Sequence, residues 1–198
     1  MAVLQPNEYD ISYFDGRSTS LKHNAGFAHY RRWYRYDGEN SLGEYWKDKA
    51  ANWVNHLAIS GKKVLEIGCA KGFLVKDLRD MGVDAYGIDV SQYAIDNCED
   101  GMSPYLSVKD GRDLSSYSRN EFDVVISLRF LECLTDAELT QFASDCNRIT
   151  KKQVHINSTD RVNQDFYIYR TSDQLLTYPF PKGTVFAWYN NETNYITK

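Results

Sequence analysis

Two short segments constrain the fold of this chain more than any other feature of its sequence. In residues 64–72 (VLEIGCAKG) an apolar run ends on Glu66 and Ile67 and enters a turn of small residues, and in residues 87–91 (GIDVS) a second run ends on Asp89. Small residues between a strand and a helix let a ligand lie against backbone N–H groups at the positive end of the helix. A carboxylate at the tip of the next strand, about twenty residues on, can accept both hydroxyls of a ribose. Together these segments predict a nucleoside-binding α/β site.

Three kinds of nucleoside ligand use such a turn. A nucleoside triphosphate needs Gly-x-x-x-x-Gly-Lys-Ser/Thr, and no such run follows the first strand. A nicotinamide dinucleotide needs Gly-x-Gly-x-x-Gly, but Ala70 stands at the second glycine and the third is not at its spacing. The remaining pattern, acid-x-Gly-x-Ala-x-Gly followed by Asp89, resembles the first two motifs of class I S-adenosylmethionine-dependent methyltransferases.

Three further segments strengthen this resemblance. Residues 109–114 (KDGRDL) resemble the segment after strand three that meets adenine, and residues 122–127 (FDVVIS) resemble the fourth-strand motif. Residues 131–134 (LECL) resemble the Leu-Glu-His-Leu that commonly follows it, with Cys133 in place of the histidine. The resemblance covers roughly residues 60–150 and implies S-adenosyl-L-methionine as cofactor and S-adenosyl-L-homocysteine as product.

The resemblance also implies roles for individual residues. Glu66 is expected to meet the amino group of the cofactor, Asp89 the ribose and Asp110 the exocyclic amine of adenine. Two alternatives stay open: a strand-end acid satisfied by backbone amides at Glu66, and a solvated loop acid at Asp110. Ser127 and Leu128 are expected to line the cavity where the methyl group points. The expected cofactor-binding residues are Glu66, Gly68, Cys69, Ala70, Gly72, Phe73, Asp89, Val90, Asp110, Gly111, Ser127, Leu128, Tyr13 and Arg31.

No general base is inherited from the family, because Cys133 stands where some relatives carry a catalytic histidine. The weak candidates are His155, Glu132 and His23. The alternative for His155 is a half-buried strand residue, and for Glu132 a residue that fixes its loop. The four cysteines have no close-paired spacing, so neither a zinc site nor a disulfide framework is expected, and no metal is expected.

The N-terminal third carries a second pattern. Residues 16–36 contain no acid but five basic residues, with aromatic residues interleaved. Three interpretations stay open: a lid whose arginine meets a carboxylate, an amphipathic segment packed on the core, and a nucleic-acid surface. Residues 9–16 followed by 24–27 resemble the N-terminal caps of small-molecule methyltransferases, which favours the lid.

The order of elements predicts an α/β fold with a doubly wound, mostly parallel sheet, because strands alternate with helices. Strands are expected at 63–67, 84–89, 105–108, 122–127 and 153–157. Helices are expected at 41–59, 72–81, 91–99, 136–149 and 172–176. Residues 166–169 are strand-like, and 184–189 with 195–198 predict a closing antiparallel hairpin. One methyltransferase domain over 1–198 is expected, with an N-terminal cap and helix (1–60), a cofactor-binding core (61–158) and a sheet closure (159–198).

Charge and composition narrow the partners. A net charge of −4 and a pI near 5.6 give no global footprint for nucleic acid. No apolar run approaches the ~20 residues that cross a bilayer, and the first ten residues lack a secretory signal, so we expect a cytoplasmic protein. The Asp-Pro-Pro-Tyr and Pro-Cys signatures of base methylation are absent. We therefore expect methyl transfer to an oxygen or nitrogen of a small-molecule acceptor. A non-catalytic S-adenosylmethionine-binding subunit and an RNA methyltransferase are the alternatives. The oligomeric state is not predicted.

Overall fold

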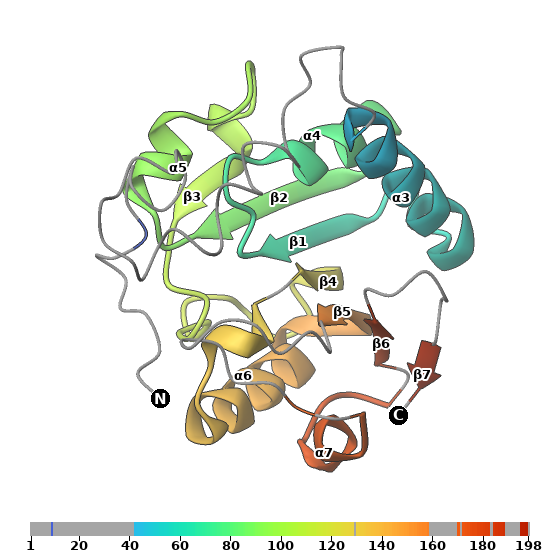
Figure 1. The fold of residues 1–198 in the computed structure, drawn as a ribbon, viewed down its shortest axis with the longest axis vertical. Coiled ribbons are helices and arrows are strands. Elements are labelled where there is room, and N and C mark those ends of the chain that lie inside the picture. The colour runs from blue at the N-terminus through green and yellow to red at the C-terminus, as the bar shows by residue number, and fades with distance from the viewer. Residues whose placement is uncertain are drawn as a thin grey trace.

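A single sheet organises the part of the chain that the structure, a computed structural model, describes (Figure 1). The described residues are 9, 42–128, 130–158, 170, 172–182, 184–188 and 195–197. The strands follow the order β3-β2-β1-β4-β5-β6-β7. Their bounds are β1 Lys63–Ile67, β2 Asp84–Asp89, β3 Leu106–Val108, β4 Phe122–Leu128, β5 Thr150–Ser158, β6 Val185–Trp188 and β7 Tyr195–Thr197.

The pairing of the strands creates one point at which the chain order reverses. From β1 the chain runs outward through β2 and β3, and it then returns to pair β4 with the other side of β1. All of these pairs are parallel, as are β4 with β5 and β5 with β6. In open parallel sheets, ligands bind beyond the carboxyl ends of the strands at such a reversal. The carboxyl ends of β1 and β4 therefore mark the candidate site.

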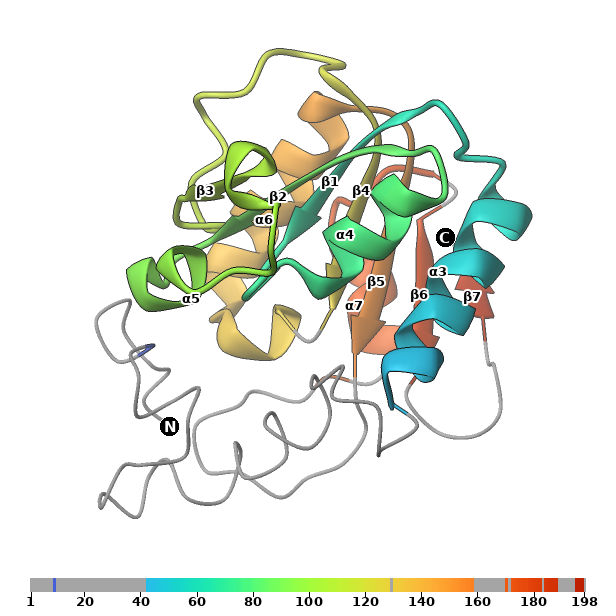
Figure 2. The same cartoon turned by 90° about the horizontal axis from the view of Figure 1, so that it is seen from above.

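Helices cover both faces of the sheet (Figures 1 and 2). One face carries α3 (Leu42–Leu57), α4 (Phe73–Asp80) and α5 (Gln92–Asp96), and the opposite face carries α6 (Asp136–Ile149) and α7 (Ser172–Thr177). Two short 3₁₀ turns, η2 (Ser103–Tyr105) and η3 (Leu131–Cys133), complete the described elements. This two-faced cover explains why the central strands are apolar almost throughout.

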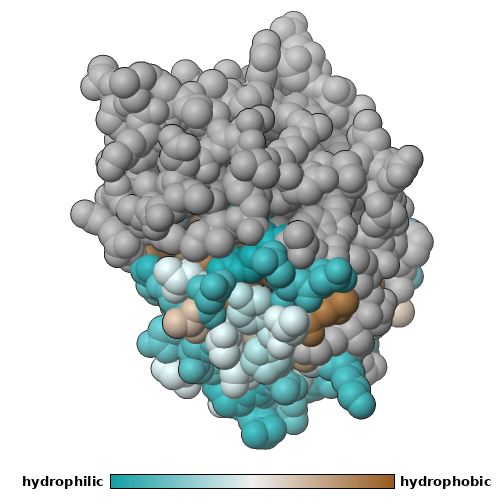
Figure 3. Space-filling view, turned by 60° about the horizontal axis from the view of Figure 1, so that its bottom comes forward, coloured by the Kyte–Doolittle hydropathy of each residue, from teal (hydrophilic) through white to brown (hydrophobic). Residues whose placement is uncertain are grey.

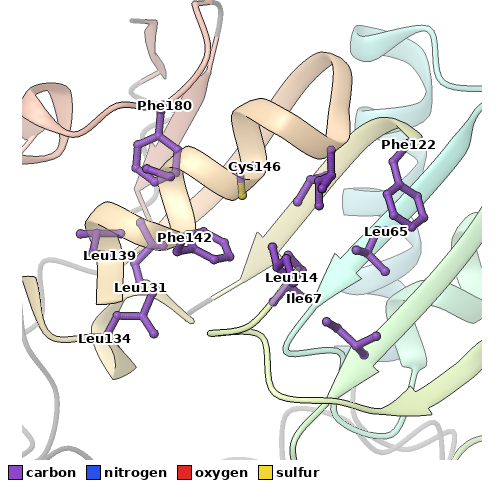
Figure 4. Close-up of a cluster of buried hydrophobic side chains, with 14 of the residues drawn as sticks. Leu65, Ile67, Leu114, Phe122, Leu131, Leu134, Leu139, Phe142, Cys146 and Phe180 are labelled. Carbon is purple, nitrogen blue, oxygen red and sulfur yellow. The ribbon is translucent and has the colours of Figure 1, made fainter. Parts of the chain in front are cut away.

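The alternation along β1 divides the core into two clusters. Leu65 and Ile67 belong to the cluster under α6, whereas Val64 belongs to the cluster under α4. Figure 4 shows Leu131 and Leu134 of the η3 segment beside Leu139 and Phe142 of α6. Because side chains alternate along a strand, Glu66 shares the α4 side with Val64. An ionisable group therefore stands in an apolar layer, one residue before the end of β1.

The parallel sheet confirms the predicted fold class, and several predicted bounds match the structure. Those of β1, β2 and α6 coincide with the expectation. The helix α5 ends at Asp96 rather than near residue 99. The next residue, Asn97, donates a side-chain hydrogen bond to the Tyr93 carbonyl at 2.8 Å. The strand β3 begins at Leu106 rather than 105 because the 3₁₀ turn with Pro104 precedes it. The strand β5 is longer than expected, since it begins directly after α6.

The end of the chain adds two strands to the sheet. Here β6 pairs parallel with β5, and β7 pairs antiparallel with β6 at the sheet edge. Residues 166–169, predicted as strand-like, lie outside the described residues, as does almost all of the predicted N-terminal cap.

The described surface is predominantly polar. Figure 3 shows that hydrophilic residues cover most of the described part of the face it presents. Among the described side chains, Val108 is the one large hydrophobic group that is exposed, at 42 %. None of the described helices is both long enough and apolar enough to cross a bilayer.

Gly72, which precedes α4, offers a test of how tightly this turn packs. Its φ is +80°, and a Cβ there would lie 2.5 Å from Leu106 Cδ1, whereas Gly101 has nearly the same φ (+79°) and open space around it. We expect Gly101→Ala to cost about 1–2 kcal/mol through the left-handed backbone alone. Gly72→Ala should cost ~1–3 kcal/mol more, because Leu106 is buried. Urea unfolding of both variants measures the difference, and equal losses would contradict tight packing between the turn and β3.

Candidate functional site

The turn that follows β1 is tied to the end of β2 by backbone hydrogen bonds. The N–H groups of Gly68 and Cys69 both donate to the Ile88 carbonyl, at 2.8 and 3.0 Å. Gly68 has a φ of +80°, and Ala70 has a φ of +51°, a left-handed conformation that an alanine rarely adopts. The turn is thus held against β2 in a conformation that needs further support.

Asp89 supplies this support from the tip of β2. Its Oδ2 accepts a hydrogen bond from the Ala70 N–H at 2.8 Å, and its Oδ1 accepts one from the Ser91 N–H at 2.9 Å. Burial raises the pKa of this carboxyl above its ordinary value, and the N–H groups of Ser91, Ala70 and Val90 partly offset that rise. The predicted proximity of Asp89 to the glycine turn is therefore confirmed. Its contact with a ribose stays a prediction.

Ser91 connects this corner to the next helix and to the start of the chain. Its Oγ accepts a hydrogen bond from the Ala94 N–H at 3.0 Å, which caps α5. The same hydroxyl donates to the Tyr9 carbonyl at 2.5 Å. Tyr9 therefore contacts Ser91, the residue whose N–H also bonds to Asp89. The other N-terminal residues proposed for the site, Tyr13, His23 and Arg31, lie outside the described residues.

Glu66 lies one residue inside the end of β1 and is only 4 % exposed. Its Oε2 is buried and has no hydrogen-bond partner among the residues that the structure describes. Burial, followed by the negative charges of Asp89 and Asp77, raises the pKa of this carboxyl from 4.5 to about 8. The alternative that backbone amides satisfy this acid is wrong for Oε2. A buried polar atom without a partner is one of the few features that calls for a ligand.

Asp110 is held by an arginine two residues away. The Nε of Arg112 donates to both carboxylate oxygens at 2.9 and 3.0 Å, and its Nη2 donates to Oδ2 at 2.6 Å. The Arg112 N–H adds a bond to Oδ1 at 2.9 Å. These bonds lower the pKa of Asp110 although burial opposes them. Asp110 is thus neither a freely solvated acid nor an open acceptor, so an adenine amine would have to compete with Arg112 for it.

The same arginine reaches the start of α6. Its Nη1 donates to Glu138 Oε1 at 3.4 Å, and Glu138 forms the capping box of α6 with Thr135. The segment expected to meet adenine is in this way connected to the loop that follows β4. The role of Arg112 was not predicted, although the residue lies within a recognised motif.

Phe130 spans the distance between two of the predicted segments. A Cβ on Gly68 would lie 3.6 Å from the Cβ of Phe130, and a Cβ on Gly111 would lie 2.8 Å from its Cζ. The ring, half-buried, also packs against Phe142 with 5.3 Å between centroids. The turn after β1 and the 110–111 segment therefore share one aromatic wall, which the sequence motifs did not reveal.

The carboxyl end of β4 contributes a second unsatisfied group. Ser127 is fully buried, its Oγ has no hydrogen-bond partner, and its register neighbour in β1 is Ile67. Leu128 follows it and is half-buried. Both residues stand at the chain-order reversal, at the end of β4 beside β1. This is the edge of the sheet at which the sequence predicts them.

The loop after β4 is fixed by an arginine from far along the chain. Arg170, 8 % exposed, donates to the carbonyls of Leu131 and Leu134 at 3.1 and 2.7 Å and, through Nε and Nη2, to Asp136 Oδ1 at 3.0 and 2.8 Å. The Tyr178 hydroxyl donates to the same Asp136 oxygen at 2.8 Å. No motif marks Arg170, because its partners are mainly carbonyl groups, which leave no trace in a sequence.

The candidate bases fall in different places. Glu132 lies in η3 and is 1 % exposed. The backbone of His155 lies in β5, beside Ile126 of β4. The thiol of Cys69, in the turn, is neutral because burial and the charges of Asp89 and Glu66 raise its pKa well above the ordinary value. The side chain of His155 and the whole of His23 lie outside the described residues, so the candidate bases stay predictions.

Comparison with known proteins identifies the central part of the chain. Residues 65–156 match the family described as "Methyltransferase domain". Over this segment the chain is therefore similar to a methyltransferase domain. The match runs from the third residue of β1 into β5, so the matched segment contains the turn, Asp89, Asp110 and the carboxyl end of β4.

Named relatives agree with this identification. The chain is 26 % identical over 165 residues to a ubiquinone biosynthesis O-methyltransferase of Methylococcus capsulatus, covering 79 % of the chain and 69 % of the relative. It is 28 % identical over 141 residues to the protein of that name in Pseudomonas syringae pv. tomato, covering 67 % and 60 %. The chain thus spans roughly six to seven tenths of the length of these relatives.

Solved structures share the fold of the methyltransferase domain. A proposed S-adenosyl-L-methionine-dependent methyltransferase of Methanococcus maripaludis aligns with a TM-score of 0.52 and 16 % identity, covering 59 % of this chain and 56 % of that one. The PH0226 protein of Pyrococcus horikoshii aligns with a TM-score of 0.50 and 21 % identity, covering 71 % and 58 %. Family and fold together imply S-adenosylmethionine as the methyl donor.

The raised pKa of Glu66 predicts how stability depends on pH. Between pH 4.5 and about 8 the folded protein keeps a proton that the unfolded chain has lost, so this group's contribution to stability falls as the pH rises. The slope is up to ~1.4 kcal/mol per pH unit. The glutamine of Glu66→Gln cannot titrate in this pH range, so the unfolding free energy of this variant should not fall for this reason as the pH rises.

Urea unfolding of both proteins from pH 5 to 9 measures the difference, in which contributions from the histidines cancel. The stability of the wild type relative to Glu66→Gln should decrease up to about pH 8 and then level off. A difference that stays constant across this range would show that Glu66 is charged throughout.

Proposed function

We propose that this protein is an S-adenosylmethionine-dependent methyltransferase that transfers a methyl group to an oxygen or nitrogen of a small molecule. The observation that carries the proposal is the turn held by Asp89 at the chain-order reversal, inside a methyltransferase domain. The relatives named as O-methyltransferases of ubiquinone biosynthesis favour an oxygen acceptor. Residues 127–130 (SLRF) lack the Asp-Pro-Pro-Tyr signature of base methylation.

The residues present fit this cofactor. The turn at residues 68–72 lies directly before the amino end of α4, and Asp89 offers a carboxylate to a ribose. The unpartnered carboxyl of Glu66 suits the amino group, and Phe130 offers an aromatic surface beside Gly111 to the base. Cys69, Phe73, Val90, Ser127 and Leu128 line the same end of the sheet in this proposal.

The protein's contribution to the reaction is alignment and exclusion of water. When bound, S-adenosylmethionine supplies a methyl group on a positively charged sulfur, which is already activated for displacement. The turn and Asp89 hold the donor, and the buried end of β4 excludes water from the line between donor and acceptor. Positioning of this kind contributes up to ~7–11 kcal/mol of a barrier, whereas positioned proton transfer contributes about 10²–10⁴-fold in rate.

The acceptor is found by supplying methyl-labelled S-adenosylmethionine to the protein in a fractionated small-molecule extract. We expect the label in a compound of low mass that carries a hydroxyl or amino group. Cofactor binding without transfer to any fraction would favour the non-catalytic binding subunit, and label in an RNA fraction would favour the RNA methyltransferase.

Asp89→Asn tests the binding site itself. The amide removes the charge and one of the two acceptor oxygens. A hydrogen bond to a charged group is worth ~1.5–3 kcal/mol, so we expect the affinity for S-adenosylhomocysteine to fall more than about tenfold. Asp84→Asn changes the same residue type at the opposite end of β2 and should leave the affinity unchanged. Calorimetric titration measures both. Equal affinities for the two variants would place the ribose away from Asp89.

A further inference from the structure

Glu66 is a buried acid to which the described residues bring no opposite charge. Its side chain is 4 % exposed, its Oε2 has no hydrogen-bond partner, and its register neighbours are Gly87 in β2 and Ile126 in β4. Neither neighbour carries a polar side chain. Burying a carboxylate without a counter-ion is so costly that such a group normally takes up a proton.

The groups that face Glu66 make its charge less favourable still. From β2 it faces Asp89, and from α4 it faces Asp77, which is 1 % exposed. From the turn it faces the thiol of Cys69, which is neutral. The described side chains that act electrostatically on Glu66 are therefore acids, and no described cation opposes them.

The proposed cofactor would bring positive charge to this place. Beside its carboxylate, S-adenosylmethionine carries two cationic groups, an ammonium and a sulfonium, and S-adenosylhomocysteine lacks the sulfonium charge. A cation near a buried carboxyl favours the ionised form, because the attraction in a poorly solvated site is strong. The acidic surroundings that disfavour an ionised Glu66 in the free protein favour a cationic ligand next to it.

We infer that Glu66 is an uncharged acid in the free protein and releases its proton to the solvent when the cofactor binds, so that it selects the ligand by its positive charge. The inference rests on the proposed function, since it needs a cationic ligand at this site. Because Glu66 releases a proton on binding, the cofactor binds more tightly as the pH rises. The gain is at most about tenfold per pH unit and ends near the pKa of Glu66 in the free protein, about 8.

The experiment is calorimetric titration of S-adenosylmethionine and S-adenosylhomocysteine into the full chain at pH 7, in phosphate and in Tris. These buffers differ in ionisation enthalpy, so the difference in heat gives the number of protons released. We expect about one proton for the wild type and close to none for Glu66→Gln, which has the shape of the protonated acid. Release with both ligands assigns the effect to the ammonium group, and release with S-adenosylmethionine alone assigns it to the sulfonium group.

Two further variants separate a role in charge selection from a structural one. Glu121→Gln changes an acid that is ion-paired with Lys63 at 3.2 Å, ahead of β4 and away from the site, and it should release as many protons as the wild type. Asp77→Asn removes one of the facing charges, so the pH at which the affinity levels off should move down.

The outcomes distinguish this inference from the proposed function. Binding accompanied by the same proton release in the wild type and in Glu66→Gln would overturn the inference and leave the proposed function standing. Absence of binding of either ligand to the wild type, between pH 6 and 9, would overturn the proposed function and the inference with it.

Discussion

The candidate site depends on the carboxylate of Asp89. Its two oxygens join the Ala70 N–H of one βα turn to the Ser91 N–H that opens the next. Ala70 has a left-handed conformation, which costs an alanine about 1–2 kcal/mol, and the bond to Asp89 offsets that cost. Because the carboxylate is used in this way, the glycine turn has its shape before any ligand arrives. The site in the free protein is therefore preorganised, and preorganisation strengthens binding without adding contacts.

The interactions around this corner form a connected series. Asp89 holds the turn, Phe130 packs between the turn and Gly111, and Arg112 connects Asp110 to the capping box of α6. Arg170 then fixes the loop between Phe130 and α6. Segments that are far apart in the sequence thereby border one end of the sheet, where family and fold imply an S-adenosylmethionine site. Substitutions at Arg170 or Arg112 should therefore affect the site through the position of these loops.

The fold was predictable where the sequence carries local signals. The bounds of β1 and β2 followed from apolar runs that end at acids, because those signals act over a few residues. The shorter α5 and the 3₁₀ turn before β3 were missed, because Asn97 and Pro104 interrupt a regular pattern in ways that periodicity does not record. The position of Asp89 beside the turn followed from the motif, since parallel neighbours bring their carboxyl ends to one edge.

The environments of the site residues were not predictable from the motifs. A motif places Glu66 at the end of a strand, but whether its carboxyl finds a partner depends on α4, which brings Asp77 rather than a cation to that face. The motif places Asp110 where it is expected to meet the adenine amine, but it does not reveal that Arg112 bonds to both of its oxygens. Arg170 was missed altogether, because it comes from a part of the chain without a motif and binds main-chain carbonyls. Long-range contacts of this kind decide the chemistry of a site whose position the sequence reveals.

The most direct test of the account is a crystal structure of the full chain grown with S-adenosylhomocysteine. The account predicts the ligand at the carboxyl ends of β1 and β4, with its ribose hydroxyls on Asp89 and its backbone contacts at residues 68–72. A ligand bound elsewhere on the chain, or a ribose that does not contact Asp89, would contradict it.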